Sequence, residues 1–328
     1  MHKFFERYFY APNLIHKFIA FLLLPLSFIY FIITMLRRKF SIYHDFNLPL
    51  ISVGNLVLGG SGKTPISQAL AQHFIDKKPA IVLRGYGRKS KDLVVVRDFN
   101  NILEHDVEIS GDEAQMLAKM LQNCTIIVSK NRYQGILKAR EMGAGLIILD
   151  DGFRFNFAKF NILLKPELEP ALPFTLPSGG YREAPFLYKS ADLILEEYCV
   201  TKSSTNYFIR KAKLLDPTER MILVTAISKP DRLLKFLGDY EILETFYFDD
   251  HASFDLDFLR QKMSELKATS IICTQKDAVK LKGFALSILD LEIIFSKDVL
   301  NKIEHYVENF KIKIGCNGSC PNALRAHL

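Results

Sequence analysis

The chain has 328 residues, of which 49% are hydrophobic and 24% charged, and 43 Lys and Arg against 36 Asp and Glu give a formal charge of +7. This composition excludes a disordered or fibrous protein, and at roughly 100 to 200 residues per domain the length predicts two domains. The positive charge suits nucleic acid, an anionic membrane or a basic surface without a specific partner, and composition alone does not choose among them.

The first predicted element is a membrane helix. Nineteen residues without a charge run from Phe18 to Leu36, with Lys17 before them and a basic stretch, 37–39, after them. At about 1.5 Å per residue such a helix is roughly 28 Å long, which matches the hydrocarbon core of a bilayer. A cleaved signal peptide would have a shorter apolar region and a cleavage site of small residues. Pro25 leaves open a bent helix that lies partly in the interface, and the basic residues at both ends do not fix the orientation.

Two α/β halves are predicted after this anchor. Short apolar runs alternate with helix-like stretches such as 65–77 and 132–142, which is the pattern of βαβ units on a parallel sheet. The strands predicted in the first half are 50–53, 80–83, 125–128 and 146–149. Those predicted in the second half are 221–227, 241–248, 270–274 and 291–295.

The domain boundaries follow from these runs. We expect a membrane anchor over 1–40, a first domain over 41–193 and a second over 220–311. Between them, at 194–219, two apolar segments flank the polar stretch Thr201 to Thr205, which predicts a β-hairpin linker that could act as a hinge.

The tail, 312–328, has no apolar periodicity. Cys316 and Cys320 lie in it, but two sulfurs without a second pair are a weak indication of a metal site, and a frayed end is the better interpretation. The five cysteines are odd in number and scattered, which predicts a reducing compartment.

The strongest motif is a glycine-rich loop directly after the first predicted strand. It reads GNLVLGGSGKTP over 54–65 and precedes a helix. Glycines let backbone N–H groups approach phosphate oxygens, a lysine can reach the β and γ phosphates, and a Thr hydroxyl can bind Mg²⁺. The strict phosphate-loop pattern is broken, because Val57 stands at its first position, and Leu58 stands where many variant loops have a second lysine. The predicted nucleotide-binding residues are Gly59, Gly60, Ser61, Gly62, Lys63 and Thr64.

A pair of carboxylates ends the strand predicted at 146–149. Asp150 and Asp151 stand where an acidic residue can contact Mg²⁺ directly or through water. Adjacent strand residues face opposite sides, so we expect one of the two to point at the phosphates. An exposed pair at a strand end is the alternative.

Several further clusters together resemble the tetraacyldisaccharide 4'-kinase family, the membrane-bound lipid A kinases of Gram-negative bacteria. They occur in the family's order and cover about residues 10 to 310. The clusters are VGNLVLGGSGKTP (53–65), LRGYGRK (83–89), GDEAQMLA (111–118), ILDDGF (148–153), LPSGGYREAP (176–185), AISKPDRL (226–233), FDDHASF (248–254) and TQKDAVKL (274–281).

This resemblance implies a kinase that uses ATP and Mg²⁺. The γ-phosphoryl group passes to the 4'-hydroxyl of the lipid A precursor, tetraacyldisaccharide 1-phosphate, at the cytoplasmic side of the bacterial inner membrane. The implied fold is a P-loop NTPase-like parallel-sheet domain and a smaller α/β domain, joined by a β-hairpin linker and preceded by a membrane helix. Membrane lipids are the implied surroundings, with neither nucleic acid nor an obligate protein partner.

The resemblance also assigns catalytic residues. Asp112 matches the acidic residue that activates the acceptor hydroxyl, and His251 matches its histidine partner from the second domain, while Lys63 acts on the phosphates. Phosphoryl transfer needs mainly positioning and charge neutralisation, so Asp112 need only accept a proton late while His251 orients it. The ordinary alternatives are a helix-capping Asp112 and a structural loop histidine.

Three more positions carry family roles. Glu113 matches a residue near the metal, and Arg182 with Glu183 matches a pair near the nucleotide, for which a surface salt bridge is the competing interpretation. The resemblance is incomplete, because Arg154-Phe155 replaces a usual Gln-His, and Gln275 replaces a usual Glu, which removes one charge near the cleft.

One loop keeps two interpretations. Tyr86 and Arg88 in RGYGR could contact sugar or lipid phosphate, or the glycines beside them could simply permit a tight turn.

Other functional classes fit less of the chain. A membrane-attached P-loop ATPase switch that regulates a protein partner agrees with the loop and the anchor, but it does not need the second half or the pair of Asp112 and His251. A guanine-specific GTPase is disfavoured because TQKD (274–277) has its lysine one place late for the guanine-reading pattern. A nucleic-acid ATPase conflicts with a membrane helix.

Overall fold

A computed structural model describes residues 2–58, 62–104, 106–198, 204–227, 230–249 and 252–310. Its helices are α1 (His2–Tyr10), α2 (Leu14–Leu22), α3 (Leu24–Lys39), α4 (Lys63–His73), α5 (Val107–Ser110), α6 (Asp112–Met120), α7 (Arg132–Glu141), α8 (Asp231–Leu234), α9 (Leu256–Leu266), α10 (Gln275–Ala278) and α11 (Lys297–Glu308), with 3-10 turns at Ile75–Lys77 and Pro185–Ser190. Its strands are β1 (Leu50–Asn55), β2 (Pro79–Leu83), β3 (Val94–Arg97), β4 (Thr125–Val128), β5 (Leu146–Asp150), β6 (Phe160–Lys165), β7 (Leu193–Glu197), β8 (Tyr207–Leu215), β9 (Met221–Thr225), β10 (Ile242–Tyr247), β11 (Ser270–Thr274) and β12 (Leu286–Phe295).

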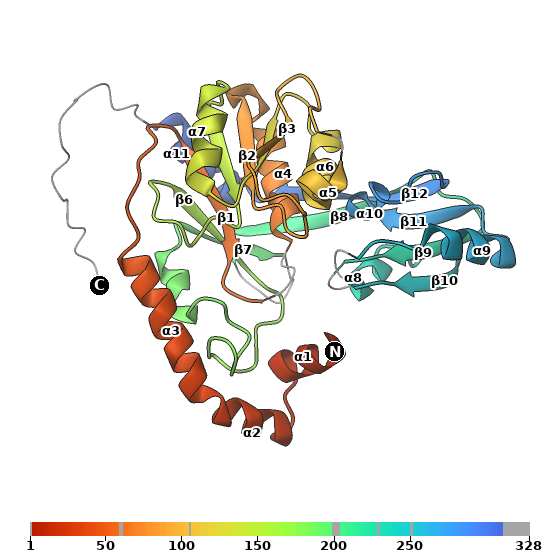
Figure 1. The fold of residues 1–328 in the computed structure, drawn as a ribbon, viewed down its shortest axis with the longest axis horizontal. Helices are drawn as coiled ribbons and strands as arrows, with labels where there is room; N and C mark the ends of the chain where they lie inside the picture. The colour runs from red at the N-terminus through yellow and green to blue at the C-terminus, as the bar shows by residue number, and fades with distance from the viewer. Residues whose placement is uncertain are drawn as a thin grey trace.

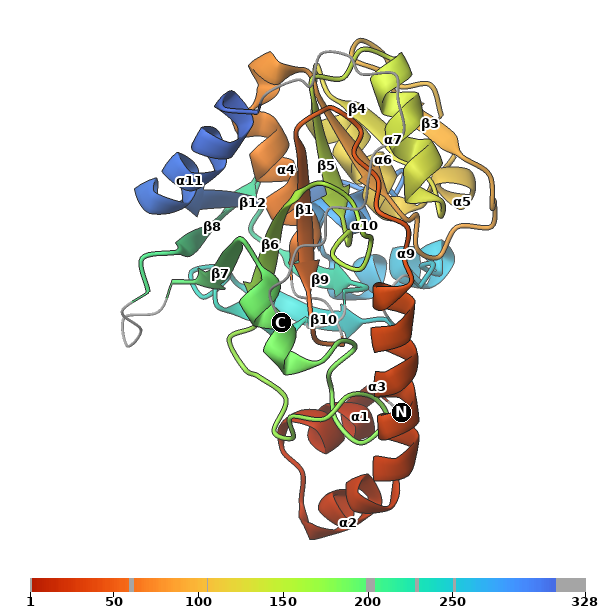
Figure 2. The same cartoon turned by 90° about the vertical axis from the view of Figure 1, so that its left-hand side faces the viewer.

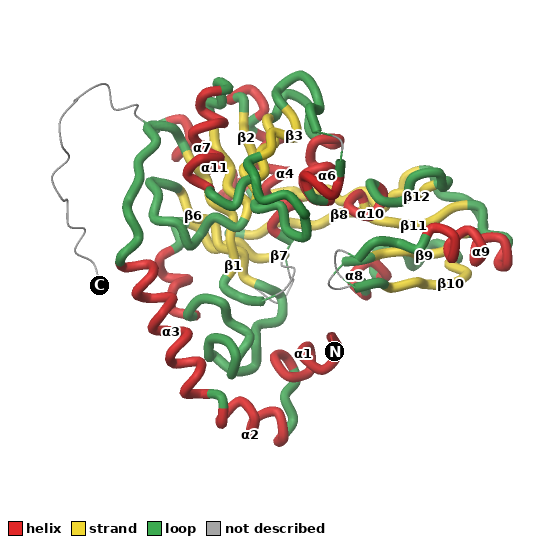
Figure 3. Tube along the Cα trace, in the orientation of Figure 1, coloured by secondary structure: helices red, strands yellow, loops and turns green. Residues whose placement is uncertain are grey.

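All described strands join one mixed sheet. Its order is β10-β9-β11-β12-β8-β7-β6-β1-β5-β2-β4-β3, and most neighbours run parallel. The seven strands from β7 to β3 form a first lobe, and the other strands extend to a smaller second lobe (Figures 1 and 3). The predicted α/β class is therefore confirmed, although the two halves share a sheet.

Helices cover both faces of the first lobe because its strands are apolar on both sides. One cluster joins Ile51 of β1 to Leu70 of α4 and also includes buried residues of α6 and α11. On the opposite face, Leu50 belongs to a cluster with Ile136 of α7. The alternation along β1 explains the arrangement, since successive side chains point to opposite faces. This packing holds the carboxyl ends of β1 and β5 next to each other.

The second lobe repeats this layering on a smaller scale. The parallel strands β10, β9, β11 and β12 carry Leu233 of α8 on one face and Leu259 of α9 on the other. The last predicted strand, 291–295, is only the end of β12, which begins at Leu286.

The predicted β-hairpin linker is wrong. β7 and β8 run parallel and share only the pairs Glu196 with Tyr207 and Glu197 with Phe208. β8 instead pairs antiparallel with β12 along eight consecutive positions, from Leu215 with Ile288 to Phe208 with Phe295. The longer ladder satisfies more backbone groups, and its strands are separated in sequence by the whole second lobe, which local pattern cannot reveal. Part of the predicted turn, 201–203, lies outside the described residues.

The predicted helix over 18–36 is broken. α2 ends at Leu22, α3 begins at Leu24 with Pro25 in its first turn, and the two axes differ by 57°. Proline lacks the N–H that would continue the α2 hydrogen-bond pattern and is well tolerated at a helix start, so the break lies where the sequence places Pro25. In the described part of the chain no single helix meets the length and hydropathy needed to cross a bilayer, but α2 and α3 together meet them as a bent pair.

α3 extends away from the first lobe alongside the segment that contains the second 3-10 turn, as Figure 2 shows. Hydrogen bonds fix it there: Ser178 N–H donates to Ser27 Oγ at 2.8 Å, and Tyr30 Oη donates to the Arg182 carbonyl at 3.1 Å. The tail from 311, with Cys316 and Cys320, lies outside the described residues. Cys124 and Cys273 are buried free thiols.

Candidate active site

A cavity of about 700 Å³ lies between the two lobes and α1. The first lobe contributes Lys63, Thr64, Tyr86, Glu113, Asp150, Asp151 and Arg182. The second lobe contributes Ile227, Arg232, Leu233, Phe236, Gln275 and Lys276, and α1 adds Phe5, Glu6, Phe9 and Tyr10. The cavity therefore has a charged floor at the end of the first-lobe sheet and an apolar wall beside α1.

The predicted phosphate loop opens into this cavity. β1 ends at Asn55, and α4 begins at Lys63 after Gly62, whose φ of 77° is a conformation that favours glycine. The first turn of α4 leaves backbone N–H groups without helical partners, which makes its end an anion site. Lys63 Nζ lies 3.3 Å from Asn55 Oδ1. Gly59, Gly60 and Ser61 lie outside the described residues.

Thr64, in the first turn of α4, is hydrogen-bonded to Asp150, the last residue of β5. Thr64 Oγ1 donates to Asp150 Oδ2 at 2.8 Å, while Asp150 Oδ1 is buried without a hydrogen-bond partner. Burial raises the pKa of Asp150, which is 5% exposed. A buried carboxylate oxygen beside a hydroxyl is a donor set that suits a hard cation. Among the described residues no cluster of three His, Cys, Asp or Glu side chains surrounds it.

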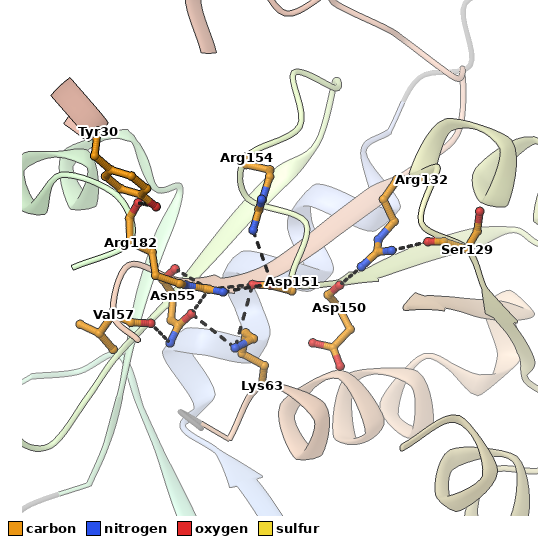
Figure 4. A network of polar contacts seen from close by, with 10 residues as sticks. All are labelled: Tyr30, Asn55, Val57, Lys63, Ser129, Arg132, Asp150, Asp151, Arg154 and Arg182. Carbon is orange, nitrogen blue, oxygen red and sulfur yellow. Dashed lines mark hydrogen bonds and ion pairs between the residues drawn. The ribbon is translucent and has the colours of Figure 1, made fainter. Parts of the chain in front are cut away.

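Asp151 points to cations instead (Figure 4). Its φ of 57° turns it away from the strand direction of Asp150, and Arg182 Nη2 approaches its Oδ1 at 2.9 Å. Lys63 Nζ and Arg154 Nη2 each lie 4.0 Å from the carboxylate. Burial alone would raise the pKa of Asp151, but Lys63 and Arg182 outweigh it and lower the pKa to about 2. Both aspartates line the cavity, Asp150 beside Thr64 and Asp151 among cations, so the expectation that one of them points at the phosphates stays a prediction.

Two further residues position these side chains: Arg132, which the sequence did not single out, and Asn55, which lies within the predicted loop 54–65 but had no role assigned. Arg132, 2% exposed, donates to the Asp150 carbonyl at 2.9 Å and to the Ser129 carbonyl. Asn55 accepts from Arg182 Nη2 at 2.5 Å and from Lys63, while its own amide donates to the Val57 carbonyl at 3.1 Å. The approach of Arg132 to Asp150 depends on strand pairing and left no signal in the sequence, whereas Asn55 lies in the same motif as Lys63.

Asp112 is the first residue of α6 and is not among the residues that line the cavity, although Glu113 beside it is. Asp112 is 3% exposed, and its Oδ2 is 2.9 Å from Lys280 Nζ and 3.8 Å from Lys276 Nζ, both of the second lobe. It does not cap α6 from the Ncap position, which Gly111 occupies. His251 lies outside the described residues, so its predicted proximity to Asp112 stays a prediction.

Of the remaining predicted residues, some line the cavity and one does not. Glu113 and Arg182 line the cavity. Glu183 is not among the lining residues; its neighbours include Arg38 at the end of α3 and Arg182, and burial raises its pKa. The structure thus brings Arg182 but not Glu183 to the expected nucleotide site.

The two candidate residues of the RGYGR loop also have different surroundings. Tyr86 is 65% exposed and lines the cavity, whereas Arg88 turns inward and donates to the Asp92 carbonyl at 2.6 Å. Gly85 has φ 68°, and a Cβ there would lie 2.2 Å from Val128 Cγ1, so the tight turn requires glycine. Gln275 lines the cavity, as expected from its place in TQKD, and its amide lies 3.3 Å from Asp290 Oδ1.

Comparison with known protein families finds one match over most of the chain. A sequence model described as LpxK, tetraacyldisaccharide-1-P 4'-kinase, matches residues 19–308. A tetraacyldisaccharide 4'-kinase of Helicobacter pylori (strain HPAG1) is 46% identical over 309 residues, which are 94% of this chain and 96% of the relative. The protein of the same name from Aliarcobacter butzleri is 43% identical over 95% of this chain and 99% of its own length.

The fold is also similar to a solved structure. LpxK from Aquifex aeolicus, crystallised in complex with ATP, aligns with a TM-score of 0.69 and 26% sequence identity, covering 88% of this chain and 99% of the other. The similarity therefore extends through both lobes.

Proposed function

The chain belongs to the tetraacyldisaccharide 4'-kinase family, and on that premise we propose how its residues perform the reaction. The activity is ATP-dependent transfer of the γ-phosphoryl group to the 4'-hydroxyl of tetraacyldisaccharide 1-phosphate in lipid A biosynthesis. The observation that carries the assignment of the site is the convergence of Lys63, Thr64 and Asp150 on one cavity, which is also lined by Glu113, the residue after Asp112.

We place the ATP phosphates at the start of α4. The N-terminus of α4 attracts anions, and the Lys63 ammonium is within reach of the same space. Asn55 and Asp151 hold Lys63 beside this space. The loop residues 59–61 are part of this proposal by resemblance to the family.

Mg²⁺ fits beside Thr64 and Asp150. The unpartnered Asp150 Oδ1 and the Thr64 hydroxyl would offer two oxygen ligands to such an ion. Such an ion neutralises charge on the β and γ phosphates. Arg132 fixes the backbone of Asp150, and Glu113, which lines the cavity, is the further acidic residue near the ion.

We assign acceptor activation to Asp112, with His251 as its partner. The acceptor hydroxyl lies between Asp112 and the γ phosphate, and Asp112 receives its proton as the new bond forms. A carboxylate paired with lysines is a weaker base than a free one, but phosphoryl transfer requires the base only late.

We propose attachment to the cytoplasmic side of the bacterial inner membrane through α2 and α3. Many of their apolar side chains are exposed to solvent in the isolated chain: Leu14, Ile15, Phe18, Phe21, Leu22, Leu26, Phe28, Ile29, Ile32, Ile33 and Leu36. An exposed apolar surface of this extent marks a membrane or protein contact, and the basic residues 37–39 suit anionic lipid headgroups. With α2 and α3 at the membrane, the apolar wall of the cavity beside α1 would face the lipid.

Label transfer tests the function. Detergent-solubilised protein is incubated with γ-labelled ATP and a tetraacylated disaccharide 1-phosphate, and labelled lipid is the expected product. Lys63→Ala serves as the inactive control. ATP hydrolysis without labelled lipid would instead support the membrane-attached ATPase switch, which the family comparison does not favour.

A further inference from the structure

α10 is fixed at the edge of the second lobe by a buried polar network. Asp277 is fully buried and accepts from Thr225 Oγ1 at 2.7 Å, from Thr274 Oγ1 at 2.8 Å and from the Ala226 N–H at 3.2 Å. These bonds tie the TQKD segment to the carboxyl ends of β9 and β11. A group carried by α10 and the turn after it is therefore held in a defined place.

Two lysines project from this fixed segment to the first lobe. Lys276 and Lys280 are separated by one helical turn, so both point to the same side. Both approach Asp112 Oδ2, Lys280 at 2.9 Å and Lys276 at 3.8 Å. The pair of Asp112 and Lys280 is largely removed from solvent, with 3% and 13% of the side chains exposed.

Lys280 has a second polar partner besides Asp112, and this partner is in the second lobe. Its Nζ donates to the Ala252 carbonyl at 3.2 Å. Ala252 directly follows His251 in the sequence. One ammonium group, which has three donors, therefore joins the carboxylate assigned as base to the backbone beside its assigned histidine partner.

We propose that Lys280 is a positioning residue for phosphoryl transfer, which fixes Asp112 and the backbone next to His251 relative to each other across the two lobes. The proposal rests on the proposed function, because it takes Asp112 and His251 as the acceptor-activating pair. Lys280 itself touches neither nucleotide nor acceptor. Lys276, which lines the cavity, is not needed for this role.

The role predicts a defined kinetic change. Lys280→Met keeps most of the side-chain volume but removes the charge and the donors, so Asp112 loses its orientation. Misplacement of a reacting group by about 1 Å can cost about 10²-fold in rate, and we expect kcat at saturating lipid to fall by up to that factor. The KM for ATP should stay near the parental value, since the phosphate loop is untouched. Lys280→Arg, which keeps the charge and donors, should restore part of the rate.

A merely structural role would behave differently. It would lower thermal stability and the yield of folded protein, but not kcat per mole of ATP-binding protein. The matched control is Lys282→Met, an exposed lysine two residues along the same turn, which should retain parental kcat. If Lys280→Met does not fold, Lys280→Gln takes its place, since it keeps a donor and loses only the charge and some length.

A double-mutant cycle shows whether Lys280 acts through Asp112 or has an effect of its own on kcat. In the Asp112→Ala background, Lys280→Met should cost little more, because groups that act as a unit give non-additive losses. The proposal would be overturned if Lys280→Met, or Lys280→Gln in its place, kept the parental kcat. It would also be overturned if the losses in log kcat of the Lys280 and Asp112 variants simply added. Failure of the proposed function would look different, because the parental protein itself would then leave the lipid unlabelled.

Discussion

At the scale of single residues, the adjacent carboxylates Asp150 and Asp151 differ because their surroundings differ. Asp150 is buried beside Thr64, and burial raises its pKa. Asp151 has a left-handed backbone conformation that directs it to Lys63 and Arg182, and its pKa falls to about 2. Two like groups with opposite pKa shifts usually have different tasks. We assign the cation to Asp150 and the positioning of Lys63 and Arg182 to Asp151.

The low pKa of Asp151 predicts an acid-sensitive contribution to stability. Its pKa drops from 3.8 to about 2 on folding, so the charged form contributes about 2 kcal/mol above pH 4, and this is lost as the pH falls from 4 to 2. The free energy of unfolding from urea denaturation should therefore differ by about this amount between the parent and Asp151→Asn at pH 6 and converge near pH 2. A difference that is the same at both pH values would contradict the assignment.

Lys63→Ala should reduce turnover severely while leaving the fold intact. It removes a positive charge near the transferred phosphoryl group, and losses of 10² or more in kcat, about 2.7 kcal/mol, are typical of such contacts. Labelled-lipid formation measures the loss, and circular dichroism checks the fold. Parental turnover in a folded Lys63→Ala protein would move the phosphate site away from this loop.

At the scale of elements, the bend between α2 and α3 determines which of their side chains are available for the proposed membrane attachment. α3 is held to the first lobe through Ser27 and Tyr30, while Ile29 and Ile33 remain exposed. A helix fixed on one side by protein and apolar on the other suits a position at the membrane interface as well as a tilted crossing.

Removal of residues 1–40 should weaken membrane attachment without abolishing it. The truncation deletes the apolar surface of α2 and α3, but Leu168, Phe174 and Phe186 remain exposed in the segment alongside α3. Fractionation of cell lysates measures the shift from pellet to supernatant. As a milder variant, Ile29→Lys with Ile33→Lys should weaken attachment while keeping the hydrogen bonds of Ser27 and Tyr30. Full-length protein that is wholly soluble without detergent would contradict the anchor.

Sequence pattern predicts elements well where the determining forces are local. The strands 125–128 and 270–274 match β4 and β11 because each is a short, fully buried apolar run. β6 was missed, since polar residues interrupt it. The parallel pairing of β7 with β8, the β8–β12 ladder and the approach of Arg132 to Asp150 depend on contacts between distant segments, which no local pattern contains.

At the scale of the whole molecule, the sheet continues from one lobe into the other through β8 and β12. Their eight paired positions connect the lobes by two strands rather than by the expected hairpin. Twisting or bending of this ladder is the motion that would open and narrow the cavity between the lobes. The contact of Lys276 and Lys280 with Asp112 joins the second lobe to the first, so it would respond to such a motion.

Joint action of Asp112 and His251 across the lobes is the last prediction. If His251 orients or polarises Asp112, then Asp112→Ala and His251→Ala should each lower kcat strongly, and the double variant should be little worse than Asp112→Ala alone. ATP affinity should survive all three changes, because neither residue belongs to the phosphate loop. Independent roles would give losses in log kcat that add, and near-parental kcat in either single variant would exclude the pair. Because the two residues come from different lobes, a non-additive result also requires that the lobes meet during turnover, which the fixed position of α10 against Asp112 favours.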